Sequence, residues 1–455
     1  MLKIFNTWSR KIEEFHPIRP GQVGMYSCGL TVYDYDHLGH AWNYTSSDLL
    51  QRVLELDGYQ VKLVMNLTDV GHLTSDADEG EDKMEKSAHK HGKTAWEIAD
   101  YYAAIFLANR DKLNLRRPEV ICKATDNIKE MIDLVQVLID KGYAYEINDG
   151  IYFDTSKFGA YGRLSGNTLE NLKEGARVEI NAEKRQSTDF ALWKFSSAGE
   201  KRQLEWSAFG RLGFPGWHIE CSAMSMKYLG PTFDIHTGGE DLIFPHHEDE
   251  IAQSEAATGV KFCNYWFHVR FLMIEGEKMS KSKKNFYRLT DIEDRGYEAL
   301  DLRYLFLTAH YRSQLNFTWA SLEGAKIARK KLNDFLSTIS DIGRADEKFS
   351  RKFLELVNDD LALPQATAMV WEVIKSNLSP EDKKATILYF DRVLGLKLDQ
   401  IASENIPEEV DELARQRQSA RNDKDFGKSD SLREQIKRLG YEIEDAADGY
   451  KLKKI

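Results

Sequence analysis

Short apolar runs alternate with one helical pattern at the start of the chain. Residues 23–28 and 61–67 are mostly apolar and have the length of buried strands. Between them, residues 36–40 form a turn, and residues 46–59 (SSDLLQRVLELDGY) carry apolar side chains at helical spacing up to Gly58. A strand, a helix and a strand with short connections predict a parallel βαβ unit.

Polar residues follow both predicted strands directly. Cys28 ends the first apolar run, and Thr68 and Asp69 follow the second. In parallel α/β sheets, ligands bind beyond the carboxyl ends of the strands. These three residues are therefore candidates for a site because of their position alone.

The middle of the chain interrupts the α/β pattern twice. Residues 72–93 are charged and poor in apolar positions, which indicates a surface loop with a fraying helix, and a helical run follows from residue 94 to about 113. Residues 127–204 indicate an inserted module. It has one amphipathic helix (128–142) and a short strand (150–154) before irregular polar segments.

The second half of the chain returns to the α/β pattern and then becomes helical. The α/β pattern resumes at about residue 206 and continues to residue 281. From residue 320 onward, long helical patterns dominate, as in residues 322–336 and 383–396. A break at residues 403–407 precedes the last helical stretches, so we expect a separate C-terminal domain.

Composition and charge set limits on the class of protein. The 455 residues are 42% hydrophobic and 30% charged, and at roughly 100–200 residues per domain they predict two to four domains. The longest apolar run, residues 101–108, is too short to cross a bilayer, and the N-terminus lacks the apolar core of a signal peptide. The four cysteines have no disulfide-scaffold spacing: Cys28, Cys122, Cys221 and Cys263. We expect a cytoplasmic protein with reduced thiols and no membrane partner.

The net charge of −11 argues against a chain that coats nucleic acid indiscriminately. Phosphate contacts need only a local basic face, so a nucleic-acid partner is compatible with this charge. Residues 411–455 hold eleven Lys and Arg against ten Asp and Glu, which makes the tail more basic than the rest.

Two motifs that lie far apart carry the strongest chemical signal. His37-Leu-Gly-His40 places two histidines three residues apart where a helix can begin, so that both can face one ligand. Gly39 has no side chain, and a nucleotide could lie against the backbone there. Lys278-Met-Ser-Lys281-Ser lies on a polar stretch without an apolar period, which suits mobile cations that close over phosphates.

Each motif alone has an ordinary structural explanation. A pair of histidines is more often part of the surface or core than of a catalytic site, and a Lys-rich stretch is usually a solvated loop. Together, in this order and around an α/β pattern, HLGH and KMSKS resemble the paired ATP-binding signatures of class I aminoacyl-tRNA synthetases.

A second group of residues could hold a metal. Pro245 suits the start of a helix, which places His246 and Glu250 four residues apart on one helical face. With Cys28 and Cys221 they would make a four-ligand zinc site. The ligands span the chain without a CxxC pair, so on spacing alone two core cysteines and a helix-surface pair are the preferred explanation.

Longer segments resemble the bacterial-type cysteinyl-tRNA synthetase family along nearly the whole chain. The WHIEC and FPHHExE segments separate this family from other class I synthetases. The matching segments are 25–33 (MYSCGLTVY), 37–40 (HLGH), 66–69 (NLTD), 189–194 (DFALWK), 215–224 (PGWHIECSAM), 234–239 (DIHTGG), 244–250 (FPHHEDE), 278–282 (KMSKS), 310–315 (HYRSQL), 421–426 (RNDKDF) and 430–433 (DSLR).

The resemblance implies one zinc ion at the bottom of an amino-acid pocket. The positions that match its ligands are Cys28, Cys221, His246 and Glu250. The zinc would bind the substrate thiolate, and sulfur chemistry would then separate cysteine from the similarly sized serine. The positions that match the pocket lining are Thr68, Trp217 and His236. Each of these also has an ordinary packing explanation.

The resemblance also implies a reaction in two steps. L-cysteine and ATP would form cysteinyl-adenylate, and the 3′ end of tRNA(Cys) would then accept the cysteinyl group. Catalysis would be electrostatic, with Mg²⁺ accompanying the ATP. The groups that would donate to phosphate are His37, His40, Lys278 and Lys281. The positions that match ATP-binding residues are His37, Gly39, His40, Gly238, Gly239, Asp241, Lys278 and Lys281.

For the fold, the resemblance implies an α/β Rossmann-type catalytic core with an inserted module. An all-α helical bundle and a small C-terminal anticodon-binding domain would follow, in a monomer. The expected segments are 1–126 (first half of the core), 127–204 (inserted acceptor-end module), 205–285 (second half of the core), 286–319 (stem-contact region), 320–400 (helical bundle) and 401–455 (anticodon-binding domain).

Some residues depart from the family pattern, and other functions are open. Trp42 stands where many members have a basic residue, and Lys283-Lys284 replaces a common Leu-Gly pair. One alternative is a ligase of the mycothiol pathway, which activates cysteine but transfers it to a sugar amine. Another is an inactive tRNA-binding module. The helical, locally basic tail favours the tRNA ligase, and the intact motifs argue against the inactive module.

Overall fold

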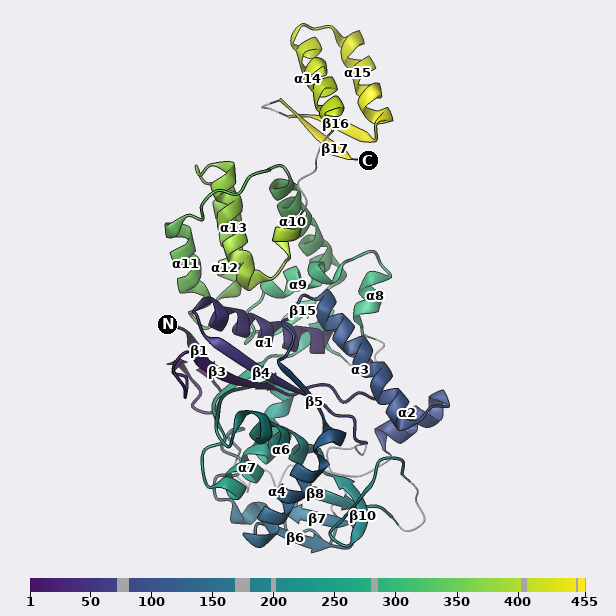
Figure 1. Cartoon of the computed structure of the whole chain (residues 1–455), viewed down its shortest axis with the longest axis vertical. Coiled ribbons are helices and arrows are strands. Elements are labelled where there is room, and N and C mark those ends of the chain that lie inside the picture. Colours follow the sequence, from purple (N-terminus) through teal and green to yellow (C-terminus); the bar gives the residue numbers. More distant parts are fainter. Residues whose placement is uncertain are drawn as a thin grey trace. The chain divides into compact units, whose positions relative to one another are not determined.

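The computed structural model (Figure 1) forms two compact units, of which the larger comprises residues 1–331 and 343–398 and the smaller residues 332–342 and 399–455. The described residues are 1–71, 82–167, 181–197, 202–279, 285–401, 407–446 and 449–454.

A five-stranded, all-parallel sheet of order β12-β11-β3-β4-β5 is the centre of the larger unit. Its strands are β3 (Gln22–Ser27), β4 (Gln60–Leu67), β5 (Val120–Lys123), β11 (Phe233–Gly239) and β12 (Cys263–Val269). The chain runs outward from β3 to β5 and then returns to the other side of β3 with β11 and β12. This is the strand order of a Rossmann-type sheet, in which ligands bind where the order reverses, beside the carboxyl ends of β3 and β11. The predicted parallel βαβ unit is confirmed.

Helices cover both faces of this sheet. Figure 1 shows α1 (Leu38–Leu56) on one side and α6 (Trp217–Leu229) with α7 (Glu248–Thr258) on the other. Helix α1 joins β3 to β4 and begins well before the apolar pattern at residue 46, because His37 caps it. Helix α3 (Ala95–Lys112) matches the helical run predicted from residue 94 to about 113.

The chain that follows β5 and α4 (Ile128–Asp140) forms a second sheet, which is antiparallel. Its order is β6-β7-β8-β10-β9. The strands are β6 (Ala144–Ile147), β7 (Gly150–Phe153), β8 (Phe190–Phe195), β9 (Trp206–Ala208) and β10 (Arg211–Pro215). Strand β10 pairs with β8, and β9 pairs with β10, so this sheet continues past the expected boundary at residue 204. Because β9 and β10 are short, only their pairing shows that they belong to the antiparallel sheet. The parallel core therefore resumes with α6.

The remaining elements of the larger unit are a hairpin at the N-terminus and a mainly helical region. Strands β1 (Lys3–Asn6) and β2 (Lys11–Glu14) pair with each other. The small sheet β14-β13-β15 and two short helices follow the core. Their bounds are β13 (Leu272–Ile274), β14 (Glu277–Lys278), β15 (Leu315–Phe317), α8 (Leu289–Glu293) and α9 (Ala299–Leu307). Helix α10 (Trp319–Ser337) belongs to the larger unit up to Lys331 and to the smaller unit from Leu332. It precedes three helices of the larger unit that pack together, namely α11 (Glu347–Val357), α12 (Leu363–Lys375) and α13 (Pro380–Leu394).

The C-terminal part of the smaller unit combines two helices with a β-hairpin. The elements are α14 (Glu408–Asn422), α15 (Phe426–Arg438), β16 (Tyr441–Ala446) and β17 (Gly449–Lys454). Val410, Ala414, Ile436, Tyr441 and Ile443 form its core. The two helices were predicted, but the hairpin was not, and most of the predicted break at 403–407 lies outside the described residues.

The charged segment 72–93 contains a helix where it is described. Helix α2 (Lys83–His91) begins at Asp82, whose carboxylate accepts the backbone N–H groups of Met84 and Glu85, and ends at Gly92 in the left-handed conformation. These two caps define a helix that the apolar-poor sequence hardly indicates. Residues 72–81 lie outside the described part of the chain.

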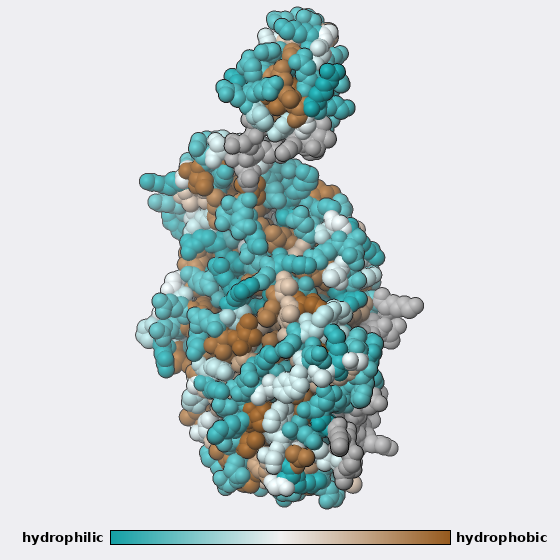
Figure 2. Space-filling view, turned by 45° about the vertical axis from the view of Figure 1, so that its right-hand side comes forward, coloured by the Kyte–Doolittle hydropathy of each residue, from teal (hydrophilic) through white to brown (hydrophobic). Residues whose placement is uncertain are grey.

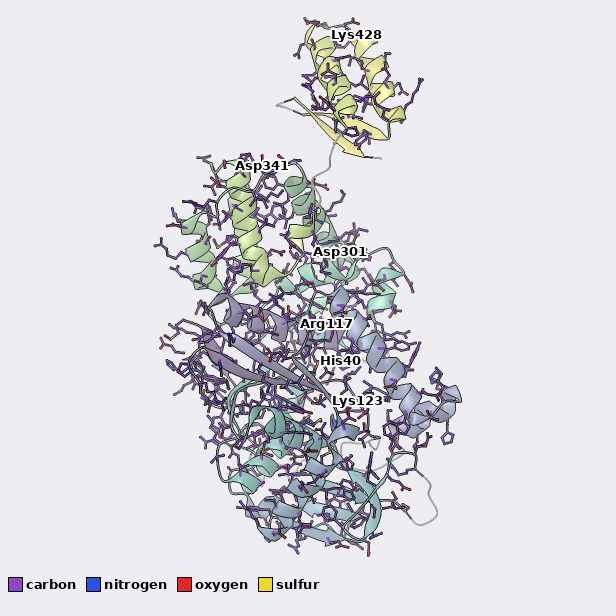
Figure 3. The ribbon with its side chains drawn as sticks, viewed as in Figure 1. His40, Arg117, Lys123, Asp301, Asp341 and Lys428 are labelled. Atoms are coloured by element: carbon purple, nitrogen blue, oxygen red, sulfur yellow. The ribbon has the colours of Figure 1, made fainter. Side chains whose placement is uncertain are left out.

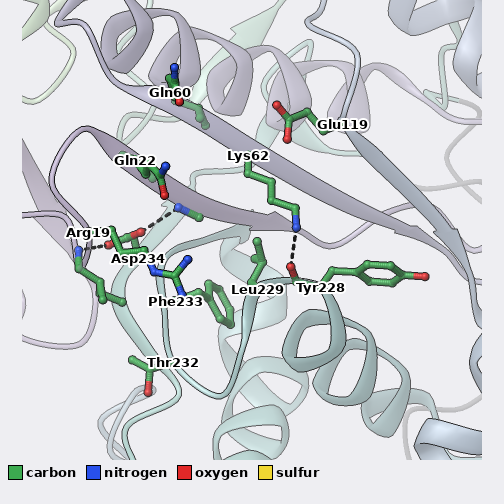
Figure 4. Close-up of a pocket in the computed structure, with 14 residues that line it drawn as sticks. Arg19, Gln22, Gln60, Lys62, Glu119, Tyr228, Leu229, Thr232, Phe233 and Asp234 are labelled. Atoms are coloured by element: carbon green, nitrogen blue, oxygen red, sulfur yellow. Dashed lines mark hydrogen bonds between the residues drawn. The ribbon is translucent and has the colours of Figure 1, made fainter.

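The amino ends of the core strands surround a separate hollow of about 310 Å³ (Figure 4). Its polar groups serve the fold: Asp234 accepts the backbone N–H of Ile18 at 2.6 Å and that of Gly24 at 2.8 Å. Lys62 donates to the carbonyl of Tyr228 at 2.7 Å. The exterior is mostly hydrophilic, with separate hydrophobic areas on the face in Figure 2. Among the described residues, no helix has both the length and the apolar character to span a membrane.

Candidate active site

A cavity of about 480 Å³ lies at the carboxyl edge of the core sheet, near the point where the strand order reverses. It collects side chains from the loop after β3, the start of α1 and the segments that follow β11 and β12. His40 in α1 and Lys123 at the end of β5 mark this edge in Figure 3. The predicted site residues that line the cavity are Cys28, His37, Gly39, His40, Trp217, Gly239, Asp241 and Lys278.

His37 and His40 cap helix α1 reciprocally. His37 Nδ1 accepts the backbone N–H groups of Gly39 at 3.1 Å and of His40 at 3.3 Å, while His40 Nδ1 accepts the backbone N–H of His37 at 3.2 Å. The two rings stack with their centroids 3.7 Å apart. Both Nδ1 atoms thus act as acceptors, which in neutral rings leaves the proton on Nε2.

Burial also keeps His40 neutral. It lowers the pKa of His40 well below its usual range, and the neighbouring His37 ring lowers it further. A neutral imidazole with its proton on Nε2 is a hydrogen-bond donor to an anion, and the start of a helix adds a positive field. The HLGH motif therefore brings hydrogen-bond donors that suit an anion to the start of α1, inside the cavity.

The first lysine of the KMSKS motif reaches the same cavity. Lys278 belongs to β14, is exposed, and places its Nζ 4.3 Å from the centroid of the Phe271 ring. Lys281 lies outside the described residues, as do Lys283 and Lys284.

The three glycines of the predicted nucleotide site have different roles. Gly39 and Gly239 line the cavity, whereas Gly238 is not among its lining residues. A Cβ at Gly238 would lie 2.6 Å from Cε1 of His247, so this glycine makes room for a buried histidine. At Gly239 a Cβ would lie 2.3 Å from Oδ1 of Asp241, whose pKa burial raises. Gly239 and Asp241 together form one wall of the cavity.

Four buried groups at the inner end of the cavity form a candidate metal centre. The ligand atoms of Cys28, Cys221, His246 and Glu250 all lie within 4.8 Å of one another. The two Sγ atoms are 3.7 Å apart, Cys28 Sγ is 3.6 Å from Glu250 Oε1, and His246 Nε2 is 3.1 Å from the same oxygen. A tetrahedral site with metal–sulfur bonds of about 2.3 Å needs sulfur atoms about 3.8 Å apart. The group therefore has the dimensions of a four-ligand site.

The electrostatics of the group also suit a cation. Burial, with Cys221 and Glu250 nearby, raises the pKa of the Cys28 thiol well above its usual range. Burial acts the same way on Cys221, but hydrogen bonds from Cys28 and His246 lower the pKa of its thiol. Burial is also outweighed at Glu250, where His236 and His246 lower the pKa to about 2. Two thiols and a carboxylate thus share one buried space, and a bound cation would favour their ionised forms together.

A second overlapping set shares two of these ligands. Cys28, His236, His247 and Glu250 also place their ligand atoms within 4.8 Å of one another. We favour the set with Cys221 and His246, because it supplies two sulfur ligands and because the His246 ring lies 4.6 Å from that of Trp217, which lines the cavity. His236 and His247 then lie behind the centre.

The predicted amino-acid pocket residues surround this centre in different ways. Trp217 lines the cavity. His236 is fully buried, and its Nε2–H donates to Glu250 Oε2 at 2.8 Å. Its ring stacks on that of Trp266, with the centroids 4.7 Å apart. Thr68 is also buried, and its hydroxyl donates to Glu220 Oε2 at 2.8 Å. Thr68 and His236 therefore contact acidic groups beside the cavity and do not line it.

Sequence reasoning gave no role to three residues around this centre. His247 Nδ1 lies 2.8 Å from His268 Nε2, and His218 Nδ1 lies 2.8 Å from His246 Nδ1. Both His218 and His247 stand beside a predicted site residue, in WHIEC and FPHHEDE. Those segments were the signal for them, but His268 is brought in only by the pairing of β12 with β11.

Comparisons with known proteins identify the family. The class is shown by a family model for the class I (C) tRNA synthetase catalytic domain, which matches residues 14–327. A model for the cysteinyl-tRNA ligase anticodon binding domain matches residues 403–450. The cysteine–tRNA ligase 1 of Burkholderia lata is 50% identical over 455 residues, covering 99% of this chain and 96% of that protein. The cysteine–tRNA ligase of Treponema denticola is 43% identical over 491 residues and covers both chains fully, at 100% each. The chain therefore belongs to the cysteinyl-tRNA synthetase family.

Solved structures of other synthetases share the fold at low identity. Methionyl-tRNA synthetase of Mycobacterium tuberculosis with methionyl-adenylate is 14% identical, with a TM-score of 0.54, and the match covers 86% of this chain and 94% of that one. A LeuRS–tRNA–LeuAMS ternary complex from Agrobacterium radiobacter K84 is 11% identical, with a TM-score of 0.57 and 85% of each chain covered. The expected class I synthetase fold is confirmed.

Proposed function

We propose that this chain is a cysteine–tRNA ligase, which activates L-cysteine with ATP and transfers it to the 3′ end of tRNA(Cys). The observation that carries the proposal is the buried Cys28–Cys221–His246–Glu250 group at the inner end of the cavity that HLGH and Lys278 line. A sulfur-rich cation site and a phosphate-binding helix end face one space. Family membership supports the same reaction.

His37 and His40 hold the phosphates of ATP in this proposal. Their Nε2–H groups donate to phosphate oxygens, and the N-terminus of α1 adds its own field. Lys278, which lines the same cavity, and Lys281 supply positive charge. These groups stabilise the charge that develops on the α-phosphate as the carboxylate of cysteine attacks and pyrophosphate leaves. Mg²⁺ would accompany the ATP and would supply further positive charge to its phosphates.

The adenosine lies along Gly39, Gly239 and Asp241. At each glycine a Cβ would meet a polar side chain, His37 at Gly39 and Asp241 at Gly239, so the missing side chain makes room for these polar groups beside the backbone. Gly238 contributes indirectly, because it makes the room that His247 occupies.

The metal in the proposal is zinc, held by Cys28, Cys221, His246 and Glu250. Two thiolates, an imidazole and a carboxylate are the donors that zinc prefers, and the spacing of the two sulfur atoms fits its bond length. Zinc would supply a Lewis acid that binds a thiolate far better than an alcohol, which separates cysteine from serine. Trp217 lines the cavity beside the metal site. Thr68 holds Glu220 by a hydrogen bond, and His236 holds the ligand Glu250 in the same way.

A tRNA substrate is supported by the C-terminal part of the chain. The match of residues 403–450 to an anticodon-binding domain distinguishes this chain from a ligase that transfers cysteine to a sugar amine.

Four free, buried cysteines suit the reducing cytoplasm that we propose as the location of this protein. The proposed domains are those expected from sequence, with the acceptor-end module extended to Pro215, and the proposed oligomeric state is a monomer.

Two assays on one preparation test the proposal. Pyrophosphate exchange that depends on cysteine measures adenylate formation, and charging of a tRNA(Cys) transcript with labelled cysteine measures transfer. We expect both activities. Exchange without charging would favour transfer to an amine, and the absence of both would favour an inactive tRNA-binding module.

A further inference from the structure

The ring of His246 is held on both of its nitrogen atoms. Nε2 faces the candidate metal centre, 3.1 Å from Glu250 Oε1, while Nδ1 lies 2.8 Å from Nδ1 of His218. His246 and His218 are each only 2% exposed. If Nε2 binds a metal, the ring proton must be on Nδ1, so His218 is the acceptor for it.

His218 is in turn oriented by a buried carboxylate. Its Nε2 lies 3.2 Å from Asp249 Oδ2, and Asp249 is 1% exposed. With Nδ1 accepting from His246, the proton of a neutral His218 is on Nε2, the nitrogen that lies 3.2 Å from the Asp249 carboxylate. Asp249 therefore favours the His218 tautomer with its proton on Nε2, and this tautomer can accept the Nδ1 proton of His246.

The last residue in this series of contacts comes from the inserted module. The hydroxyl of Tyr161 donates to Asp249 Oδ1 at 2.6 Å. A few residues later, the backbone N–H of Ser165 donates to Glu248 Oε2 at 2.9 Å. The turn that carries Tyr161 is thus attached to the first two residues of α7, the helix that also carries Glu250.

We propose that His218 is a positioning residue for the metal ligand His246, and that Asp249 and Tyr161 hold it in place. The inference rests on the proposed metal site and adds residues that the function did not assign. Through this series of contacts, a turn of the inserted module helps to orient the metal ligand His246 at the inner end of the amino-acid pocket. Outer hydrogen bonds of this kind fix the tautomer and the direction of a ligand and raise its affinity for the metal.

The test measures zinc affinity by competition with a chromophoric chelator, together with the d–d absorption of the Co²⁺-substituted protein. Asp249→Asn keeps the volume but removes the charge that orients His218, and Tyr161→Phe removes one hydroxyl. Removing an outer partner of a metal ligand weakens metal binding by roughly 10–100-fold. We expect Asp249→Asn to fall within that range, Tyr161→Phe to show a smaller loss in the same direction, and both to shift the Co²⁺ bands.

Tyr145→Phe is the matched control. The Tyr145 hydroxyl also donates to a buried aspartate of the inserted module, Asp189, at 2.7 Å, but neither residue belongs to the metal group. It should keep the zinc affinity and the Co²⁺ spectrum of the unmodified protein. Circular dichroism and thermal unfolding check that each variant is folded, and Tyr161→Phe, the mildest change, decides the matter if Asp249→Asn does not fold.

Unchanged zinc affinity and Co²⁺ bands in folded Asp249→Asn and Tyr161→Phe would overturn the positioning role. Unchanged zinc affinity in Cys221→Ser would instead overturn the metal site on which it rests, so the two failures are distinguishable.

Discussion

His37 and His40 each accept the backbone N–H of the other through Nδ1, at 3.3 and 3.2 Å, and their rings stack 3.7 Å apart. The same two side chains therefore begin helix α1 and line the cavity. Since both Nδ1 atoms serve the helix, the Nε2–H group of each neutral ring is the donor that remains for a ligand.

Substitutions at His37 should separate these two roles. Asparagine is a good N-cap residue, so His37→Asn should unfold at nearly the same urea concentration as the unmodified protein, while His37→Ala should lose about 1 kcal/mol of unfolding free energy. Both should lose roughly 10²–10³-fold in pyrophosphate exchange, because a donor to the developing phosphate charge is gone. Full exchange activity in His37→Asn would show that the ring serves only the helix.

Cys221→Ser should lose zinc and raise the KM for cysteine by at least about tenfold, since a sulfur ligand is replaced by a weaker one. Cys122→Ser is the matched control, because Cys122 is also a buried thiol but donates to the carbonyl of Met65. Metal content by mass spectrometry and the exchange KM measure both effects. Equal zinc content in the two variants would contradict the ligand assignment.

Asp36 should make stability depend on pH. Burial raises its pKa to about 6 in the folded protein, although Asn109 donates to it at 2.8 Å and lowers the pKa in part. A raised pKa favours folding below the pKa of the unfolded chain, near 3.8, and this contribution is lost as the pH rises through about 6. The free energy of unfolding of Asp36→Asn should therefore rise relative to that of the unmodified protein as the pH increases from 4 to 7, by up to about 3 kcal/mol. Urea unfolding at both pH values measures it, and a constant difference would be the contrary result.

Trp42 should matter for packing rather than for tRNA. It is only 2% exposed, its indole N–H donates to the carbonyl of Arg270 at 2.9 Å, and its ring lies 5.3 Å from that of Phe306. Trp42→Ala should cost about 3–5 kcal/mol of unfolding free energy, and Trp42→Phe much less. In folded Trp42→Phe, the KM for tRNA should be unchanged. A raised KM for tRNA without lost stability would show that Trp42 contacts the tRNA instead.

Removing residues 399–455 should separate the two steps of the reaction. These residues include the match to the anticodon-binding domain, whereas the cavity and the metal group belong to the larger unit. The truncated protein should keep cysteine-dependent exchange and lose most of its tRNA charging. Full charging would contradict a role of this part in binding tRNA.

The features that could be predicted from the sequence are those that local patterns or family motifs indicate. The parallel unit of β3, α1 and β4 followed from its apolar runs, and the cap at His37 explains why α1 begins earlier than its apolar period. The helix α7 begins at Glu248, after Pro245 and His246, yet His246 still reaches Glu250 at 3.1 Å. A π-helical turn (Ile243–His247), in which only Phe244 departs from helical backbone values, leads directly into α7, so the helical start expected at Pro245 and the expected contact are both present.

Features that depend on distant partners were missed. Strands β9 and β10 are short, and only the pairing of β10 with β8, and of β9 with β10, assigns them to the inserted sheet. The β16–β17 hairpin consists of charged residues around a few apolar ones, which a single strand pattern does not reveal. His218 is an ordinary helix residue in sequence, and its role depends on Asp249 and on Tyr161 from another module.

The most direct measurement of the central claim is X-ray absorption at the zinc edge, without and with substrate. In the free protein we expect two sulfur ligands, from Cys28 and Cys221, and two nitrogen or oxygen ligands, from His246 and Glu250. Addition of L-cysteine should add a third sulfur, and addition of L-serine should change nothing. A zinc environment that cysteine leaves unchanged, or one without two sulfur ligands in the free protein, would contradict the account that this centre reads the substrate thiol.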